Sequence, residues 1–362
     1  MKTVTFYLMI SSVFFLGGLT SLSPIYIMFF PLSIISVLNC IYKKKIKLGK
    51  ESVLILIYIL YLGISQIFIL KGRFNFIFLE ILSYLYYLLL KNNLYFVKIN
   101  DLKKYILKLY IFAIILMSLD TFKRYLFPTI TKKLYYLEKF NLGFYKYKYG
   151  SIMFRDSNSV GVLALVLYIF LEILLEKKFY KIKDIKWIRL ILIFLIFFTL
   201  SRAAIIVFLG FYFIKKFQIN LKKLKFIVVM IVPILITFVY IKFKSDLSFK
   251  SKFHILEESF IIVNKVGILN KIIGIGYDNI QKYIGVAGHN YLVIGFIESG
   301  LIGGGLIISI FIILYFKIKS AKKLIVAIFC INFSFLPIAK TFLFSIFAIL
   351  NKIERVEKNK IK

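Results

Sequence analysis

Three short stretches of this 362-residue chain carry side chains suited to chemistry on phosphate and hydroxyl groups. They are MFRDSNSVG (153–161), TLSRAA (199–204) and GHNYL (288–292). Arg155 and Arg202 are planar and permanently charged, and an arginine of this kind binds two phosphate oxygens at once. Histidine has an unperturbed pKa of about 6.5, which suits His289 to take a proton from a hydroxyl group at neutral pH. These residue types point to phosphate binding and to general base catalysis.

Each stretch also has a simpler structural explanation. Arg155 is suited to anchor a helix end at lipid headgroups, and the residues that follow it, 156–158, are of the types that cap a helix N-terminus. Capping and ligand binding are compatible, because a helix N-terminus is itself an anion site. Arg202 is the one charged residue in 190–214, and such an arginine is functional, paired, or a turn residue that faces water. His289 alone would also fit an ordinary polar residue at the membrane boundary.

Glu298 is a further polar residue in the apolar stretch that follows His289. It lies nine residues further along the chain. On an ideal helix this spacing places it on the opposite face and about 13 Å deeper, so it is not expected to orient the histidine. A carboxylate inside a membrane needs a partner, and we expect Arg202 or Arg155 from a neighbouring helix to supply it.

The composition predicts a polytopic integral membrane protein that binds no nucleic acid. The chain is 61% hydrophobic with a mean hydropathy of +0.89, and its apolar runs approach the roughly 20 residues that cross a bilayer. The net charge of +34 is spread over many short segments. Cys40 and Cys330 have no disulfide or metal-ligand spacing. No HExxH, DxD, clustered ligand pattern or Walker loop occurs, so we expect neither a metal nor a cofactor.

The apolar runs predict an all-α protein with a single transmembrane domain over 1–362 and about twelve spans. The predicted spans are 4–19, 24–42, 52–70, 74–90, 105–119, 159–175, 187–200, 202–214, 226–243, 290–316, 323–336 and 341–351. One continuous helix over 187–214 would place Arg202 inside the membrane at a cost of about 2.5–3.5 kcal/mol. We therefore predict two helices, or a re-entrant pair, joined at Ser201 and Arg202.

The lysines predict the orientation of the chain. Short loops rich in Lys and Arg stay on the cytoplasmic side of a membrane. Four or more Lys occur in each of the segments 43–51, 91–104, 176–189, 215–225 and 317–323. These segments alternate with nearly uncharged loops, so both termini are predicted to be cytoplasmic. Two long external loops then cover 120–158 and 244–289, and the three polar stretches gather at the outer face, each at the start of a helix.

The order and spacing of these motifs resemble the O-antigen ligase and O-antigen polymerase superfamily of bacterial envelope enzymes. The resemblance covers about residues 150–310 and rests on FRDSNSVG before a span, TLSRAAII at the next outer turn, and GIGYDN followed by GHNYLVIGFIESGLIGG. It implies a C-type membrane glycosyltransferase fold that acts without a metal on undecaprenyl-pyrophosphate-linked glycans. The site would face outward from the bacterial cytoplasmic (inner) membrane. The matching positions imply roles for Arg155, Arg202 and His289.

The resemblance leads to a specific hypothesis for the reaction. Arg202 and Arg155 bind the pyrophosphate of the donor and stabilise the charge that grows on it. His289 deprotonates the acceptor hydroxyl, and Asn290 orients the site or the sugar. The other residues that we predict to bind substrate are Asn158, Ser201 and Glu298.

Three functions fit this pattern. We favour a polymerase of lipid-linked O-antigen or capsule repeat units, because the outer loops are small for docking a lipid A core. An O-antigen ligase, which transfers the glycan to a lipid A core, has the same motifs. A transporter or flippase of lipid-linked oligosaccharide suits the many spans, but transporters place polar groups near the bilayer midplane in repeated folds. The expected partners are the lipid-linked glycans, the lipid bilayer, and a chain-length regulator or other envelope polysaccharide assembly proteins.

Overall fold

Helices dominate the part of the chain that the computed structural model describes, which is residues 2–20, 23–42, 48–69, 74–129, 146–216, 247–284, 291–331 and 340–361. The first helices are α1 (Lys2–Ser11), α2 (Pro24–Tyr42), α3 (Lys50–Tyr61) with its π-helical continuation η1 (Leu62–Ile69), α4 (Phe74–Asn93) with the 3₁₀ turn η2 (Leu94–Phe96), and α5 (Ile99–Leu126). An antiparallel hairpin of β1 (Tyr149–Ser151) and β2 (Arg155–Asp156) follows. The remaining helices are α7 (Ser157–Glu176), α8 (Ile182–Phe198), α9 (Arg202–Lys216), α11 (Leu247–Lys265), α12 (Ile268–Ile273), α13 (Ile280–Ile284), α14 (Tyr291–Lys317), η4 (Lys319–Ala321), α15 (Lys322–Ile331) and α16 (Lys340–Ile361).

Five of the described helical segments are long and apolar enough to cross a membrane. They are Pro24–Tyr42, Phe74–Phe96, Ile99–Leu126, Ser157–Glu176 and Val293–Lys317. The surface of α2 has the apolar stripe expected of a lipid-facing helix, because Ile34, Leu38 and Ile41 lie on one side of it and are each more than half exposed. These segments confirm the all-α class and indicate an integral membrane protein. The count of twelve spans and the orientation stay predictions.

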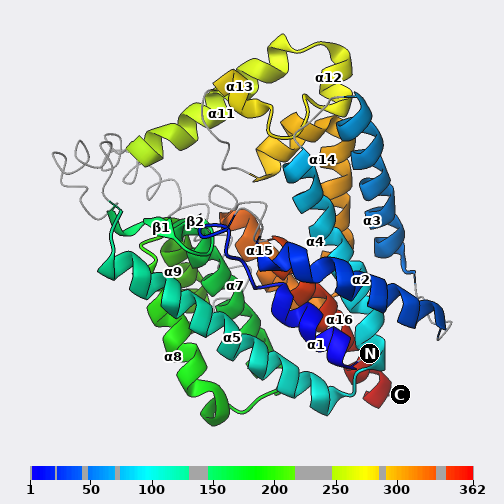
Figure 1. Cartoon of the computed structure of the whole chain (residues 1–362), viewed down its shortest axis with the longest axis vertical. Helices are drawn as coiled ribbons and strands as arrows, with labels where there is room; N and C mark the ends of the chain where they lie inside the picture. The colour runs from blue at the N-terminus through cyan, green and yellow to red at the C-terminus, as the bar shows by residue number, and fades with distance from the viewer. Residues whose placement is uncertain are drawn as a thin grey trace.

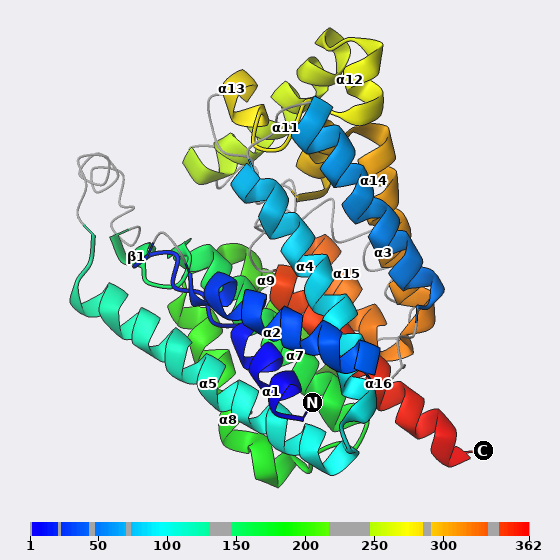
Figure 2. The same ribbon diagram turned by 45° about the vertical axis from the view of Figure 1, so that its right-hand side comes forward.

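The α7 helix lies at the centre of the helix bundle. Apart from Glu172 near its end, its sequence after the first turn is apolar on every side, which is typical of a helix surrounded by protein, and nearly all of it is buried. It packs against α5, α8, α9, α15 and α16. Figure 1 and Figure 2 show α5, α7, α8 and α9 in one half of the molecule and α3, α4 and α14 in the other, with α15 and α16 between them. The α11, α12 and α13 helices cover one end of the second half.

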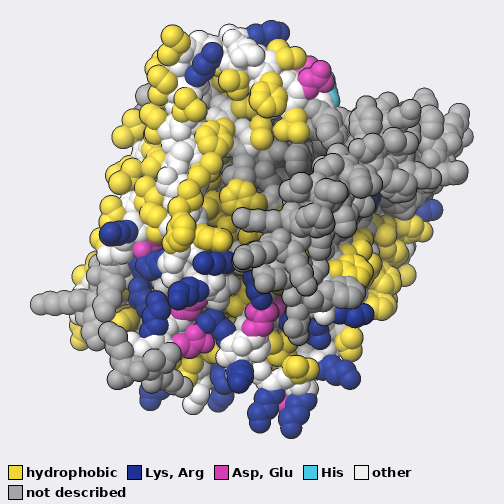
Figure 3. All heavy atoms as spheres, turned by 180° about the vertical axis from the view of Figure 1, so that it is seen from behind, with side chains coloured by type: hydrophobic (Ala, Val, Ile, Leu, Met, Phe, Trp, Pro, Cys, Tyr) yellow, Lys and Arg dark blue, Asp and Glu magenta, His cyan; other side chains and the backbone are white. Residues whose placement is uncertain are grey.

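Ion pairs join the helix ends that the lysine pattern predicts to lie on one side of the membrane. The pairs are Lys2–Asp101, Lys91–Glu51, Lys317–Glu51, Arg189–Glu172, Lys215–Glu172, Lys323–Glu176 and Lys177–Glu357. Figure 3 shows charged side chains gathered over one end of the molecule, with hydrophobic side chains along the helices above them. We refer to the end formed by these pairs as the charged end. The pairs connect the helices in three groups, which are α1 with α5, α3 with α4 and α14, and α7 with α8, α9, α15 and α16. The side of the membrane that these helix ends face stays a prediction.

The stretch 187–214 forms two helices, as predicted. The α8 helix ends at Phe198, and α9 begins at Arg202 after a turn of three residues. Leu200 in this turn has a φ of 54°, which is a left-handed conformation that cannot continue a helix. The break therefore comes at the position where a continuous helix would have carried Arg202 into the membrane interior.

Other predicted boundaries differ from the structure. The predicted span 4–19 is wrong as one helix, because α1 ends at Ser11 and the chain then continues in turns to residue 20. Both predicted external loops contain helices. The α5 helix continues into 120–158 as far as Leu126, and the described residues of 244–289 form α11, α12 and α13. The predicted span 226–243 lies outside the described residues.

Candidate functional site

Two of the three polar stretches meet at the start of α7. This helix follows Arg155 and Asp156 of β2, and α9 begins with Arg202. The hydroxyl of Ser157 donates a buried hydrogen bond of 2.7 Å to the carbonyl oxygen of Thr199. The bond joins the first residue of α7 to the turn before α9, so the two helix N-termini are neighbours. We call this place the α7–α9 junction.

Gly161 allows α7 to approach that turn closely. A Cβ atom at this position would lie 2.7 Å from Thr199 Oγ1 and 2.7 Å from Ser201 Cβ, which is too close for packed atoms. The close approach buries Ser201 completely. The Oγ atoms of Ser159 and Ser201 are both buried without a hydrogen-bond partner in the described part of the chain. Because buried hydroxyls are normally paired, these two unpaired oxygens are exceptions to the usual pattern.

Asp156 and Asn158 form the cap of α7. Asp156 is the N-cap residue, and its Oδ1 accepts a 2.7 Å hydrogen bond from the backbone N–H of Asn158. The Asn158 side chain donates from Nδ2 to Asp156 Oδ2 at 3.0 Å. The capping interpretation is therefore confirmed. The Asn158 amide, which we predict to bind substrate, is engaged within the protein.

Asp120 and Arg124 at the end of α5 hold the β1–β2 hairpin. Asp120 Oδ1 accepts hydrogen bonds from the Ser151 hydroxyl at 2.6 Å and from the Ile152 backbone N–H at 2.7 Å. Arg124 pairs with Asp120 at 2.9 Å and donates to the carbonyl oxygen of Tyr147 at 2.6 Å. Both charged side chains are fully buried. The sequence marks Asp120 only as a carboxylate in a predicted external loop, so this role is found from the structure.

The segment that follows α1 holds the same hairpin through its backbone. The N–H groups of Gly17 and Gly18 donate to the carbonyl oxygens of Met153 and Ile152 at 2.9 and 3.0 Å. A Cβ atom on Gly18 would lie 1.9 Å from the carbonyl oxygen of Ser151, so this contact requires glycine. The α1 helix ends at Ser11, and the chain continues in turns to this contact. Together with α5, this contact fixes the backbone that leads into β2 and α7.

The predicted catalytic residues are only partly covered by the described structure. Arg202 is half-buried at the first position of α9. The backbone of Arg155 belongs to β2, whereas its side chain lies outside the described part. His289 and Asn290 lie in 285–290, which is also outside the described residues. The structure thus brings the chain segments of the two arginines together and leaves the position of the histidine as a prediction.

Glu298 lies in the other half of the molecule, on α14. Its side chain is 5% exposed, and its carboxylate accepts hydrogen bonds from the backbone N–H groups of Asp278 and Ile280. Lys340 on α16 attracts the carboxylate electrostatically. We expect an arginine as its partner from the sequence, but the groups that the structure places around it come from the loop before α13 and from α16.

Two glycines bring the GIGYDN stretch (274–279) against α14. Gly274 and Gly300 have φ angles of 95° and 69°, and a Cβ atom on Gly274 would lie 2.1 Å from the carbonyl oxygen of Glu298. The N–H groups of the two residues after Gly274 donate to the carbonyl oxygens of Ile297 and Glu298 at 3.1 and 3.0 Å. Since α14 is broken at Gly300, the loop supplies partners for carbonyl groups near the break. This explains why the loop, and not an arginine, surrounds Glu298.

A buried ion pair between Glu80 of α4 and Lys340 of α16 is absent from the sequence-based prediction. Both side chains are fully buried. The hydroxyl of Tyr58 donates to Glu80 Oε1 at 3.4 Å and shares a 2.8 Å hydrogen bond with the hydroxyl of Tyr277. Burial, and then the Glu80 carboxylate, raise the pKa of Tyr277 well above its ordinary value. One sequence signal could have found this pair: Glu80 is the lone carboxylate in the predicted span 74–90. A carboxylate inside a membrane needs a partner or a function.

The chemistry that the α7–α9 junction supports is anion binding. Two helix N-termini carry the positive ends of their helix dipoles, and each stands beside an arginine in the sequence. The Asp156 carboxylate occupies part of the N-terminus of α7. Within the described part of the chain, no cluster of three or more His, Cys, Asp or Glu side chains forms a candidate metal site. In comparisons with known proteins, no family model, no curated protein and no solved structure matches the chain.

Proposed function

We propose that this protein is a metal-independent membrane glycosyltransferase that polymerises undecaprenyl-pyrophosphate-linked oligosaccharide repeat units, as an O-antigen or capsule polymerase. It acts at the outer face of the bacterial cytoplasmic membrane. The observation that carries the proposal is the hydrogen bond between Ser157 and Thr199. This bond makes neighbours of two distant sequence stretches, each of which has an arginine at a helix N-terminus.

Two features of the α7–α9 junction support the proposal of a pyrophosphate site. A pyrophosphate carries several negative charges, which arginines and helix N-termini stabilise without a metal. The hairpin that leads into α7 is held by α5 and by the segment after α1. A site built on a fixed backbone stabilises developing charge more effectively, because its dipoles need not reorganise during the reaction.

The proposed reaction is a single displacement at the anomeric carbon of the donor sugar. An acceptor hydroxyl forms the new carbon–oxygen bond while the bond from that carbon to the pyrophosphate oxygen breaks, and the electron pair leaves with the pyrophosphate. Arg202 and Arg155 stabilise the departing charge. His289 accepts the proton of the hydroxyl, and Asn290 orients the sugar. One displacement inverts the configuration of the anomeric carbon.

In this proposal Asn158, Ser201 and Glu298 have positioning roles. Asn158 braces the N-cap of α7, and the buried Ser201 packs against Gly161 where the two helices meet. Glu298 holds the backbone of the loop before α13, from which the chain continues toward His289. These three residues therefore act on the shape of the site.

A transporter or flippase of lipid-linked oligosaccharide is a second candidate. The observation that favours it is the fully buried pair of Glu80 and Lys340, because ionisable groups inside a membrane protein often mark a transport pathway. The two candidates depend on different residues. Polymerisation requires Arg202 and His289, whereas transport through the bundle would require the Glu80–Lys340 pair.

The test is the glycan pattern of a strain that lacks this gene and carries one variant at a time, at matched membrane levels. The variants are wild type, Arg202→Ala, His289→Ala, Glu80→Gln and the control Lys183→Ala, which changes an exposed residue of α8. We expect the deletion to leave single repeats on the lipid anchor. Wild type and Lys183→Ala should restore long chains, and Arg202→Ala and His289→Ala should not.

The other outcomes separate the alternatives. Long chains that remain on undecaprenyl pyrophosphate in the deletion strain would identify an O-antigen ligase. Repeat units trapped on the cytoplasmic side, together with loss of function only in Glu80→Gln, would identify a flippase. Normal chain lengths from both Arg202→Ala and His289→Ala would refute the proposed site.

A further inference from the structure

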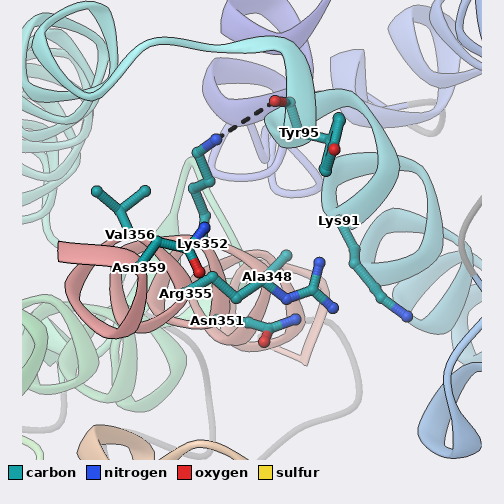
Figure 4. Close-up of a pocket in the computed structure, with 8 residues that line it drawn as sticks. All are labelled: Lys91, Tyr95, Ala348, Asn351, Lys352, Arg355, Val356 and Asn359. Carbon is teal, nitrogen blue, oxygen red and sulfur yellow. Dashed lines mark hydrogen bonds between the residues drawn. The ribbon is translucent and has the colours of Figure 1, made fainter. Parts of the chain in front are cut away.

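A cavity of about 340 Å³ lies between the end of α4 and the polar half of α16. Its polar lining comes from Lys91, Tyr95, Asn351, Lys352, Arg355 and Asn359. Figure 4 shows Arg355 extending from α16 toward Lys91 on α4, with the amide of Asn351 beside it. Cationic and amide groups from two helices therefore line one space.

The cavity is at the charged end, away from the α7–α9 junction. The polar half of α16 is connected to the end of α7 by the ion pair between Lys177 and Glu357. The junction, in contrast, is at the first residue of α7, which is a helix of 20 residues and hence about 30 Å long. The cavity is therefore distinct from the proposed catalytic site.

The cavity has an excess of positive charge. Three of its lining residues are cations and none is a carboxylate. Lys91 pairs with Glu51 at 2.7 Å, but Glu51 also binds Lys317, so one carboxylate serves two ammonium groups. Arg355 forms no ion pair with the carboxylates of the described part of the chain. The protein thus leaves this charge for another anion to neutralise.

The acidic residues of α16 face other parts of the protein. Glu354 accepts a 2.6 Å hydrogen bond from the backbone N–H of Ser320, and Glu357 pairs with Lys177. The cavity-lining positions 351, 355 and 359 are four residues apart, so they share one face of the helix. The helix therefore separates its cations and amides from its carboxylates.

Lys352 and Arg355 repel each other across this face. Burial, and then the charge of Arg355, lower the pKa of Lys352. The Lys352 ammonium donates a 3.3 Å hydrogen bond to the carbonyl oxygen of Tyr95, which keeps it at the edge of the cavity. An anion bound between these two cations would replace repulsion with two favourable contacts.

We propose that this cavity binds a phosphate group, supplied either by an anionic phospholipid or by a soluble phosphate compound. The Arg355 guanidinium provides paired donors that match phosphate oxygens, Lys91 and Lys352 add charge, and the amide of Asn351 adds a neutral donor. Basic pockets between the ends of membrane helices are suited to anionic headgroups. A zwitterionic headgroup is disfavoured, because its cationic part would be repelled by the same residues.

The test uses the purified full-length protein in a neutral detergent. The unfolding midpoint is followed against increasing concentrations of short-chain phosphatidylglycerol, short-chain phosphatidylcholine, or inorganic phosphate. Wild type is compared with Arg355→Gln and with the control Lys358→Gln, which changes an exposed lysine of the same helix. For Arg355→Gln, we expect the ligand concentration that gives the same rise in the unfolding midpoint to be about tenfold higher than for wild type. The Lys358→Gln control should respond as wild type does.

The ligand series identifies the source of the phosphate. Stabilisation by phosphatidylglycerol and not by inorganic phosphate assigns the site to a lipid headgroup, and stabilisation by both assigns it to the phosphate group itself. The proposal is overturned if phosphatidylcholine acts equally well, if neither phosphate ligand stabilises wild type, or if Arg355→Gln responds normally. Should Arg355→Gln fail to fold, Arg355→Lys keeps the charge without the paired donors and should still weaken binding, by about threefold.

Discussion

The hydroxyl of Ser157 bonds the carbonyl oxygen of Thr199 at 2.7 Å, across 42 positions of sequence. The bond is buried, so it is not exchanged with water. Any change that separates these two residues also separates the backbones that carry Arg155 and Arg202.

Gly161→Ala tests whether that contact is needed for activity. The added methyl group would meet Thr199 and Ser201, so we expect a loss of about 1–3 kcal/mol of stability and shortened glycan chains. Gly210→Ala is the matched control, because it adds the same methyl group to α9 where no atom lies within 4 Å. The control should be neutral or stabilising by up to about 1 kcal/mol. Unfolding midpoints and glycan ladders measure both effects, and a normal ladder from Gly161→Ala would contradict the prediction.

Asp120→Asn tests the attachment of the hairpin to α5. The change leaves Arg124 as an unpaired buried cation, which should cost about 3–5 kcal/mol. It also weakens the hydrogen bonds that Asp120 accepts from Ser151 and Ile152. We therefore expect faster hydrogen exchange in 146–156 as well as a lower unfolding midpoint. Asp184→Asn, at an exposed position of α8, should change neither quantity.

A double-mutant cycle tests the buried pair of Glu80 and Lys340. Removing one partner leaves the other as an uncompensated buried charge, so Glu80→Gln and Lys340→Met should each destabilise the protein by about 3–5 kcal/mol. The double variant should recover a large part of that loss, because no unpaired charge remains. Chemical unfolding in detergent measures the four species. Additive losses would show that the two side chains do not depend on each other.

The lowered pKa of Glu51 predicts that the protein loses stability in acid. Burial acts to raise the pKa of its carboxyl group, but hydrogen bonds from Lys317 and Lys91 outweigh burial and lower the pKa to about 2 from an ordinary value of 4.5. A lowered pKa in the folded state stabilises the protein above pH 4.5, and this stabilisation is lost as the pH falls from 4.5 toward 2. The unfolding midpoint of wild type should fall over this window.

Two variants isolate the contribution of Glu51. Glu51→Gln removes the titrating group, so its unfolding midpoint should be lower than that of wild type at neutral pH and should depend less on pH in acid. Glu257→Gln, which changes an exposed residue of α11, should keep the pH dependence of wild type. If the unfolding midpoints of wild type and Glu51→Gln change equally with pH, the acid sensitivity comes from other carboxylates.

Local sequence signals predicted several features correctly. The cap of α7 follows from Asp156 and its neighbours, because capping depends on residues within one turn. The break between α8 and α9 follows from the cost of placing Arg202 inside a membrane helix. Each of these inferences needs only the residue types within a short segment.

Contacts between distant segments could not be predicted in the same way. The pair Glu80 and Lys340 joins residues separated by 260 positions, and nothing near either residue identifies its partner. The chain that follows the early end of α1 makes a backbone contact between Gly18 and the hairpin, which a pattern of hydrophobicity does not report. Charge along the sequence predicts arginine partners for Glu298. Its partners are largely backbone N–H groups of a loop.

The break in α14 has a consequence for the biogenesis of the protein. Carbonyl groups of Ile297 and Glu298 take their hydrogen bonds from residues that precede α13, and unpaired carbonyl groups are costly in lipid. The second half of this helix can enter the bilayer as an ordinary apolar segment, but the first half is complete only after the GIGYDN loop has docked. We therefore expect docking of the GIGYDN loop to come before the final insertion of α14, so that the folding of one segment governs when the next becomes stable in the membrane.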